Sequence, residues 1–230
     1  FTYKNNNYAA LSDINLYLDC NKSFAIVGPT GSGKSTFLDI LLGFTIPQSG
    51  YLKLDEKKLL SDQRESIRGN FSYVPQKVFI LEATLKDNIT FGSKINEDKL
   101  DDVLKICQLK SLIDNLPQGI ETKISESTPM VSGGQKQCIG FARALYKDTK
   151  ILIIDEATNA MDKQLENKLI TSIKASKINS IISITHKPSM LNYFDEILVF
   201  DSGKLSAAGS LCDLSQSNEF ISKMINSDYL

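Results

Sequence analysis

The sequence has no tryptophan, one histidine and four cysteines, and these small numbers exclude several kinds of site. Cys20, Cys107, Cys138 and Cys212 stand far apart, and none forms a C-x-x-C pair. This spacing argues against a disulfide framework and a clustered zinc site, so we expect free thiols in a reducing compartment. No apolar run approaches the roughly 20 residues that a membrane-spanning helix needs. No signal peptide is visible either.

The sequence also lacks an excess of charge of either sign. It has 26 basic and 27 acidic residues, which gives a formal net charge of -1. A balanced charge offers no electrostatic reason to expect nucleic acid or an anionic membrane surface as a partner. Its 230 residues suffice for one sizeable core with a small satellite subdomain. Because the chain begins at Phe1 within an apparent strand, we expect a segment of a longer protein.

Four short aliphatic runs predict buried strands. They are Phe24–Val27, Ile151–Ile154, Ile181–Ile184 and Ile197–Phe200. Successive residues in each run are apolar, so both faces of each strand should be covered. This pattern is typical of a parallel sheet with helices on both sides. The predicted fold class is therefore α/β, with a central, mostly parallel sheet.

An alternating pattern predicts a second, smaller sheet. Ile14, Leu16 and Leu18 are separated by single residues of other types, and Leu52 and Leu54 repeat the pattern after Gly50. Alternation indicates half-buried antiparallel strands. We therefore expect a small antiparallel β-subdomain beside the main sheet.

A helical pattern predicts an inserted subdomain. Leu100, Val103, Leu104 and Cys107 have the i, i+3, i+4, i+7 spacing of one buried helix face. We place a helical subdomain at about residues 77–142. The catalytic core would then comprise residues 1–76 and 143–230.

A glycine-rich loop follows the first buried strand and precedes an apolar helix. The loop consists of Gly28, Pro29, Thr30, Gly31, Ser32, Gly33, Lys34, Ser35 and Thr36. Strand, loop and helix are the context of the phosphate-binding P-loop. Backbone N–H groups and the helix N-terminus would hold phosphates. Lys34 would contact the β and γ phosphates, and the Ser35 hydroxyl would bind Mg²⁺.

Two carboxylates end a second buried strand. Asp155 would support Mg²⁺, and Glu156 is placed to polarise the attacking water. Alone, the pair could be an acidic turn. Beside a phosphate loop, it predicts ATP hydrolysis.

The segment Val131-Ser132-Gly133-Gly134-Gln135 could be a helix cap, but it resembles the LSGGQ signature of ATP-binding cassette (ABC) transporters. A turn of this kind at a helix N-terminus offers N–H donors to a phosphate. The resemblance implies that Ser132, Gly133, Gly134 and Gln135 contact ATP held by a second nucleotide-binding domain, as in a head-to-tail homodimer.

The same resemblance covers nearly the whole chain and implies four more site residues. Tyr3 matches the aromatic residue that stacks on adenine, although a strand aromatic in the core is the alternative. Gln76 matches the glutamine that touches Mg²⁺ and the attacking water. Asp162 ends Asn-Ala-Met-Asp, where the family usually has SALD. His186 stands at the family's γ-phosphate sensor, although a single histidine after an apolar strand is more often structural.

The segment from Val74 to Ile89 resembles the exporter-type branch of the family. That resemblance implies a transmembrane domain in the same polypeptide and a position at the cytoplasmic face of the inner or plasma membrane. The domain would power export or the flipping of a lipid or glycolipid.

One departure and two alternatives accompany this interpretation. Cys138 stands where the family usually has arginine, which removes a fixed charge from the signature helix. The first alternative is a regulatory domain that binds ATP without hydrolysing it. Cys138 is compatible with this alternative, but the presence of Glu156 and His186 argues against it. A DNA-repair type ABC ATPase would need long heptad repeats between Lys34 and Asp155, and this spacing leaves no room for them.

Overall fold

The computed structural model describes residues 1–4, 6–55, 57–58, 68–127 and 130–227. The chain forms two compact units. Unit 1 comprises residues Phe1–Phe71 and Asn179–Leu230, and unit 2 comprises residues Ser72–Ile178. The predicted helical segment at about residues 77–142 falls inside unit 2.

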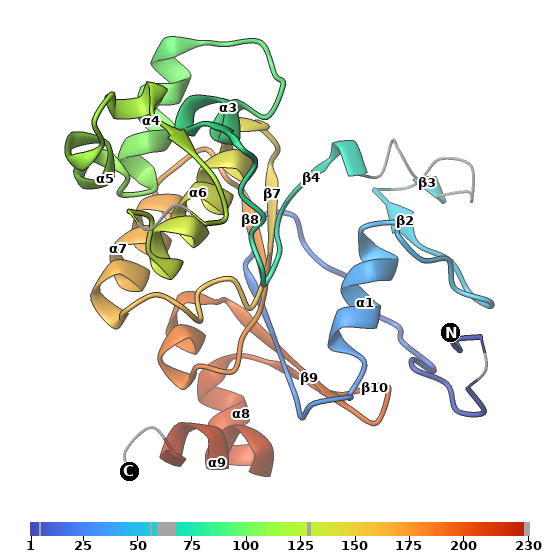
Figure 1. The fold of residues 1–230 in the computed structure, drawn as a ribbon. Coiled ribbons are helices and arrows are strands. Elements are labelled where there is room, and N and C mark those ends of the chain that lie inside the picture. The colour runs from blue at the N-terminus through green and yellow to red at the C-terminus, as the bar shows by residue number, and fades with distance from the viewer. Residues whose placement is uncertain (5, 56, 59–67, 128–129, 228–230) are drawn as a thin grey trace. The chain divides into compact units, whose positions relative to one another are not determined.

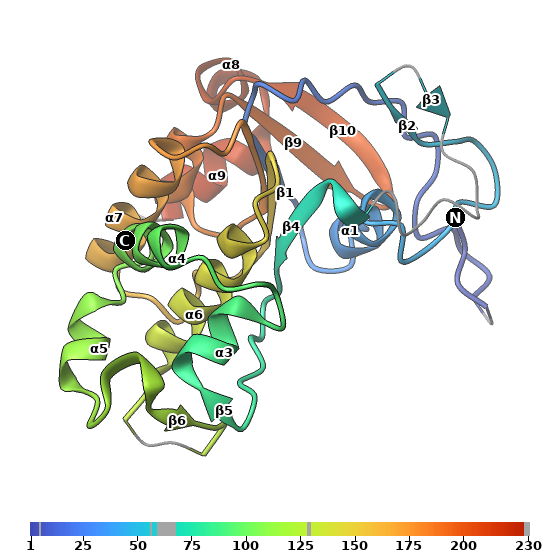
Figure 2. The same ribbon diagram turned by 90° about the horizontal axis from the view of Figure 1, so that it is seen from above.

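Unit 1 is built on four neighbouring strands. They are β1 (Phe24–Val27), β8 (Ser180–Ile184), β9 (Glu196–Asp201) and β10 (Lys204–Gly209), in the order β10-β9-β1-β8. β1 is parallel to β8 and to β9, whereas β10 is antiparallel to β9. β9 and β10 lie side by side in both views (Figures 1 and 2). All four residues of β1 are buried, as its uninterrupted apolar sequence predicts.

Four helices and a small sheet are also described in unit 1. They are α1 (Lys34–Leu41), η2 (Pro188–Tyr193), α8 (Leu211–Ser217) and α9 (Glu219–Ser227), with the antiparallel pair β2 (Lys53–Leu54) and β3 (Lys57–Lys58). Ser210 is the N-cap of α8, because its side chain accepts a hydrogen bond from the Asp213 N–H. The core of unit 1 includes Phe24, Ile26 and Phe200.

Unit 2 holds the remaining elements. Its strands are β4 (Phe71–Val74, whose first residue belongs to unit 1), β5 (Ala83–Thr84), β6 (Lys123–Ile124) and β7 (Ile151–Asp155). Its helices are α3 (Leu85–Thr90), α4 (Glu97–Ile106), α5 (Lys110–Asn115), η1 (Gly119–Glu121), α6 (Gly133–Tyr146) and α7 (Lys163–Lys174). α6 packs against α3 and α4, and α7 contacts α4. β7 and β4 are neighbouring strands, and β5 pairs with β6.

The buried strands predicted from the aliphatic runs are confirmed as β1, β7, β8 and β9. The predicted helix face is also confirmed, because Leu100, Val103 and Leu104 are buried on α4 and Cys107 is buried at its C-cap. Asn96 caps the N-terminus of α4, because its side chain accepts a hydrogen bond from the Lys99 N–H. The pattern of apolar residues thus located both the buried strands and the α4 helix.

The strand predicted at residues 14–18 is wrong. Burial does alternate there, with Ile14, Leu16 and Leu18 half-buried and Tyr17 exposed, but these residues form no strand. Phe1–Tyr3 do not form a strand either. Alternation requires only that one side of the chain faces the protein, whereas a strand also needs a neighbouring backbone in register.

Candidate functional site: a phosphate loop and a carboxylate group

The phosphate loop connects β1 to α1 within unit 1. Gly33 is the N-cap of α1 and has a φ of 99°, a left-handed conformation that glycine adopts without strain. A Cβ at Gly33 would come within 2.7 Å of the Ala10 carbonyl oxygen. Glycine is therefore required here by backbone conformation and by the close approach of Ala10.

Lys34 is held against its own loop. Its Nζ atom donates hydrogen bonds of 2.8 Å to the carbonyl oxygens of Gly28 and Pro29, and the residue is only 6% exposed. The ammonium therefore lies at the loop and does not extend into solvent. A buried ammonium at the N-terminus of α1 suits the binding of an anion such as phosphate.

Ser32 provides a test of whether the loop fits a ligand. Its Oγ atom is buried and has no hydrogen-bond partner among the residues that the structure describes. Burying a polar atom without a hydrogen bond costs free energy, and a bound ligand that forms the hydrogen bond removes this cost. The unpartnered oxygen, the buried ammonium and the α1 N-terminus together fit the phosphates of a nucleotide.

Tyr3 lies close to the C-terminal end of this loop. Its hydroxyl is 3.0 Å from Oγ1 of Thr36, and its ring stands edge-on to Phe1 with centroids 4.9 Å apart. The side chain is not a core aromatic, because Tyr3 is 40% exposed. An exposed ring next to a phosphate loop retains surface on which a base could stack.

His186 leaves the sheet at the same edge as the phosphate loop. β8 pairs with β1 in parallel with Ile184 opposite Ile26, and the Thr185 N–H donates to the Ile26 carbonyl over 3.2 Å. The next residue, His186, is exposed. The register of two parallel strands thus brings a histidine and the start of the phosphate loop to one end of unit 1.

The carboxylate group belongs to unit 2. Asp155 ends β7 and accepts a hydrogen bond of 3.2 Å from the Tyr73 hydroxyl on β4. Glu156 follows with a positive φ of 50°. Its Oε2 atom accepts hydrogen bonds from Gln76 Nε2 at 2.9 Å and Asn159 Nδ2 at 3.3 Å. The predicted glutamine and the predicted base therefore contact each other directly.

The signature turn, Ser132–Gln135, forms the N-terminus of α6. The Ser132 side chain accepts from the Gln135 N–H over 3.3 Å, and the Gln135 side chain accepts from the Ser132 N–H over 2.8 Å. This reciprocal capping box fixes the start of the helix. A Cβ at Gly134 would lie 3.2 Å from the Ala160 carbonyl oxygen, so the turn packs closely against the loop that begins at Asn159.

Asp162 ends that loop and begins α7, because its Oδ1 atom accepts from the Leu165 N–H over 2.9 Å. The loop is also tied to α6, since the Ala160 N–H donates to Gln137 Oε1 over 3.2 Å. Asp162 therefore has a structural role as an N-cap whatever it contacts in a complex.

Cys138 is buried in α6, with an exposed fraction of 1%. Burial, with a smaller contribution from the negative charge of Asp162, raises the pKa of the Cys138 thiol to about 12. The side chain is therefore neutral at physiological pH. It supplies neither the charge nor the donors of an arginine at this position.

The predicted residues thus fall into two groups. Unit 1 holds the phosphate loop, Tyr3 and His186, and unit 2 holds Gln76, Asp155, Glu156, the signature turn and Asp162. Sequence reasoning missed two contacts. Asn159 was noted only as a departure from SALD, although its amide reaches Glu156. Gln48 gave no signal, because it binds the backbone of Thr2, 46 residues away.

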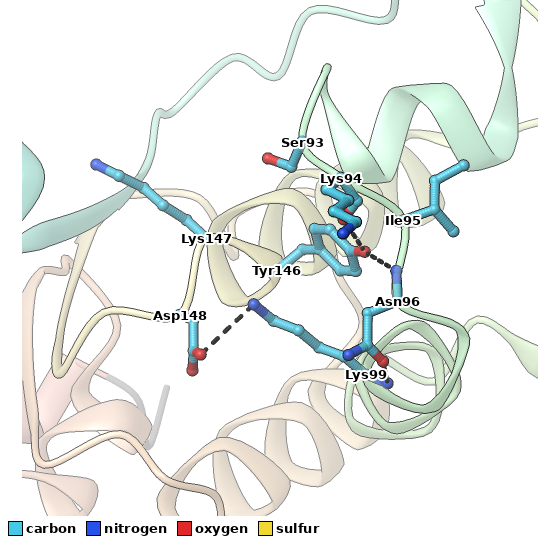
Figure 3. A pocket seen from close by; sticks show the side chains of 8 residues that line it. All are labelled: Ser93, Lys94, Ile95, Asn96, Lys99, Tyr146, Lys147 and Asp148. Atoms are coloured by element: carbon cyan, nitrogen blue, oxygen red, sulfur yellow. Dashed lines mark hydrogen bonds and ion pairs between the residues drawn. The ribbon is translucent and has the colours of Figure 1, made fainter.

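A polar surface pocket of about 470 Å³ lies elsewhere in unit 2 (Figure 3). Its lining residues are Ser93, Lys94, Ile95, Asn96, Lys99, Tyr146, Lys147 and Asp148. The Tyr146 hydroxyl accepts from the Asn96 N–H over 2.8 Å and donates to the Lys94 carbonyl over 3.1 Å. Lys99 pairs with Asp148 at 3.6 Å. None of the predicted site residues lines this pocket.

Among the described residues, no helix is both long enough and apolar enough to cross a membrane. The same part of the chain holds no cluster of three or more His, Cys, Asp or Glu side chains suited to a metal ion.

A parallel α/β sheet whose first strand runs into a glycine-rich loop and helix defines a P-loop nucleotide-binding domain. The sequence profile of the family described as "ABC transporter" matches residues 11–159. The chain belongs to the ABC transporter family.

Relatives and solved structures place the chain in the exporter-type branch. An export ATP-binding/permease protein of Rickettsia typhi is 40% identical over 222 residues, which cover 95% of this chain and 38% of that protein. An ATP-dependent lipid A-core flippase of Ralstonia nicotianae is 34% identical over 215 residues, covering 91% of this chain and 36% of the flippase. The chain therefore spans less than two fifths of the length of these relatives.

A solved structure, described as a bacterial Atm1-family ABC exporter with ATP bound, matches the whole chain with a TM-score of 0.93. It is 31% identical, and the match covers 41% of the exporter chain. The predicted fold class, with a mostly parallel sheet and small antiparallel sheets, is confirmed. So is the assignment to the ATP-binding domain of an ABC exporter, whose enzyme class is ATPase.

Proposed function

We propose that this domain binds ATP with Mg²⁺ and hydrolyses it to power export, or the flipping of a lipid or glycolipid, by a transmembrane domain in the same polypeptide. The domain would then lie at the cytoplasmic face of the inner or plasma membrane. The observation that carries the proposal is the phosphate loop, where the buried Ser32 Oγ has no hydrogen-bond partner within the described part of the chain and Lys34 is held at the loop. The names of the relatives support the link to export.

Each group of residues has a defined task in this proposal. The phosphate loop and Lys34 hold the phosphates, and Tyr3 stacks on the adenine. Ser35, Asp155 and Gln76 offer the oxygen ligands that Mg²⁺ prefers, and Mg²⁺ when bound supplies positive charge against the phosphates. Ser132, Gly133, Gly134, Gln135 and Asp162 serve the nucleotide of a second copy in a head-to-tail dimer.

The reaction is a direct in-line displacement. A water oxygen bonds to the γ-phosphorus while the bond to the bridging oxygen of ADP breaks, and the water proton passes to Glu156. Because the transition state is loose, position and charge decide the rate. The hydrogen bonds from Gln76 and Asn159 restrict the carboxylate of Glu156, and His186 would contact the γ-phosphate.

Glu156→Gln tests the assignment of the base. We expect ATP to bind as in the unmodified chain, while hydrolysis falls by about 100-fold or more because general-base catalysis is lost. An ATP-bound dimer should accumulate. Binding is measured by calorimetry, phosphate release by a colorimetric assay, and mass by light scattering.

Glu219→Gln is the matched control, since Glu219 is exposed and forms an ion pair with Lys223 on the surface of α9. It should hydrolyse ATP at the normal rate. Normal hydrolysis by Glu156→Gln would overturn the base assignment, and a chain that binds no ATP would overturn the proposed function as a whole.

A further inference from the structure

The backbone of Thr2 is clamped by a side chain from a distant part of unit 1. The Thr2 N–H donates to Gln48 Oε1 over 2.8 Å, and Gln48 Nε2 donates to the Thr2 carbonyl over 2.9 Å. One carboxamide therefore satisfies both backbone groups of one residue, as a neighbouring strand would. This clamp is notable because residues 1–3 have no strand to hold them.

The residues on either side of Thr2 are also fixed within unit 1. Before it, the Phe1 carbonyl accepts from the Ala10 N–H over 2.8 Å. After it, the Tyr3 hydroxyl lies 3.0 Å from Thr36 Oγ1 in the phosphate loop. Tyr3 is thus held at its hydroxyl by Thr36 and at its own carbonyl by the Asn6 N–H over 3.1 Å. Gln48 adds a restraint on the residue that precedes it.

These contacts act together on the plane of the Tyr3 ring. A tyrosine side chain turns about two torsions, so its orientation depends on where the backbone places the Cα–Cβ bond and on what holds the hydroxyl. A ring that already lies in the correct plane stacks on a flat base more favourably, because the side chain then loses no conformational entropy on binding. Without Gln48, the backbone groups of Thr2 would bond to water and residues 1–3 would lose a long-range contact.

We infer that Gln48 is a positioning residue for Tyr3 and thereby strengthens recognition of the adenine base. The inference rests on the proposed function, in which Tyr3 stacks on adenine. Gln48 itself touches Thr2 and acts only through it. Its effect should therefore be specific to the base-bearing part of a nucleotide and absent for phosphate groups alone.

The experiment compares ADP with pyrophosphate, two ligands that this ATPase does not consume and that differ by adenosine. Dissociation constants are measured by calorimetry on the full chain for the unmodified protein, Gln48→Ala, Tyr3→Ala and the double variant. We expect Gln48→Ala to weaken ADP binding about three- to fivefold, the scale of one net hydrogen bond, and to leave pyrophosphate binding unchanged. In the Tyr3→Ala background, Gln48→Ala should have no further effect.

Two further variants sharpen the comparison. Gln48→Glu keeps an acceptor for the Thr2 N–H but loses the donor to the Thr2 carbonyl, so it should weaken ADP binding as well. Asn115→Ala removes another carboxamide, which donates to the Ser111 carbonyl four residues away in unit 2, and it should change neither dissociation constant.

The outcomes separate this inference from the proposed function. Equal weakening of ADP and pyrophosphate by Gln48→Ala, or the same loss with and without Tyr3, would overturn the positioning role. ADP binding that is unaffected by Tyr3→Ala would overturn the base contact and this inference with it, while phosphate binding at the loop would stand. Failure of the unmodified chain to bind ADP would reject nucleotide binding itself.

Discussion

Asn159 donates a hydrogen bond of 3.3 Å to Oε2 of Glu156, the same oxygen that accepts from Gln76. The family usually has serine at the position of Asn159, and a serine hydroxyl is shorter than an asparagine amide. The amide therefore adds a second restraint on the carboxylate that we assign as the base.

We expect Asn159→Ala to lower the rate of ATP hydrolysis about three- to tenfold, as the loss of one hydrogen bond to a charged group predicts. ATP binding should be unchanged, because the hydrogen bond that is lost goes to the carboxylate of Glu156. Steady-state phosphate release gives kcat and KM separately. Asn115→Ala again serves as the matched control, and a rise in KM at constant kcat would contradict a role at Glu156.

The proposed shared site predicts how activity depends on protein concentration. If Ser132 and Gly134 of one copy complete the site of another, the specific activity should rise with concentration until the dimer is saturated. ATP hydrolysis is measured over a wide range of chain concentrations, with dimer content followed by light scattering. A specific activity that stays constant over that range would argue against shared sites.

The buried thiol of Cys138 predicts a loss of stability at high pH. Its pKa is raised from 9.0 to about 12 by burial and by the charge of Asp162. The folded chain therefore keeps the thiol protonated while the unfolded chain ionises it. The contribution of the buried thiol to the free energy of unfolding is fully present below pH 9. It is lost as the pH rises toward 12, with a slope of up to about 1.4 kcal/mol per pH unit.

Urea unfolding at pH 8 and pH 10.5 measures this loss. Cys138→Ala should lose less unfolding free energy between these two pH values than the unmodified chain, because one ionising group has been removed. Cys212→Ala removes an exposed thiol and should behave like the unmodified chain. Equal losses for Cys138→Ala and the unmodified chain would contradict the raised pKa.

Arg143 connects α6 to the segment around α3. Its Nε atom donates to the Asn88 carbonyl over 2.9 Å, an Nη atom donates to the Phe79 carbonyl over 3.0 Å, and the guanidinium lies 4.5 Å from the ring centroid of Phe91. An ammonium cannot reproduce this planar set of contacts.

We therefore expect Arg143→Lys to lower the free energy of unfolding by about 1–3 kcal/mol, and Arg143→Met to lower it further. Urea unfolding measures both. Lys105→Met on the exposed face of α4 is the control and should change stability by less than about 0.5 kcal/mol. An unchanged midpoint for Arg143→Lys would show that charge alone suffices.

Local sequence predicted the elements that depend on contiguous or periodic residues. Aliphatic runs located β1, β7, β8 and β9, and a helical repeat located α4, because burial selects apolar side chains with the period of the element. The motif at residues 28–36 predicted strand, loop and helix together. The strand predicted at residues 14–18 failed because side-chain alternation carries no information about backbone partners.

The sequence by itself determined the chemistry of this protein: a phosphate loop, a pair of carboxylates and a signature turn, each encoded by adjacent residues. Only the tertiary structure decided the contacts between residues far apart in the chain. It brought Gln76 to the carboxylate of Glu156 and the amide of Gln48 to the backbone of Thr2, and it buried the Cys138 side chain, which keeps that thiol neutral. The reason is that hydrogen bonds and burial depend on distance in space, which sequence spacing does not specify beyond a few residues.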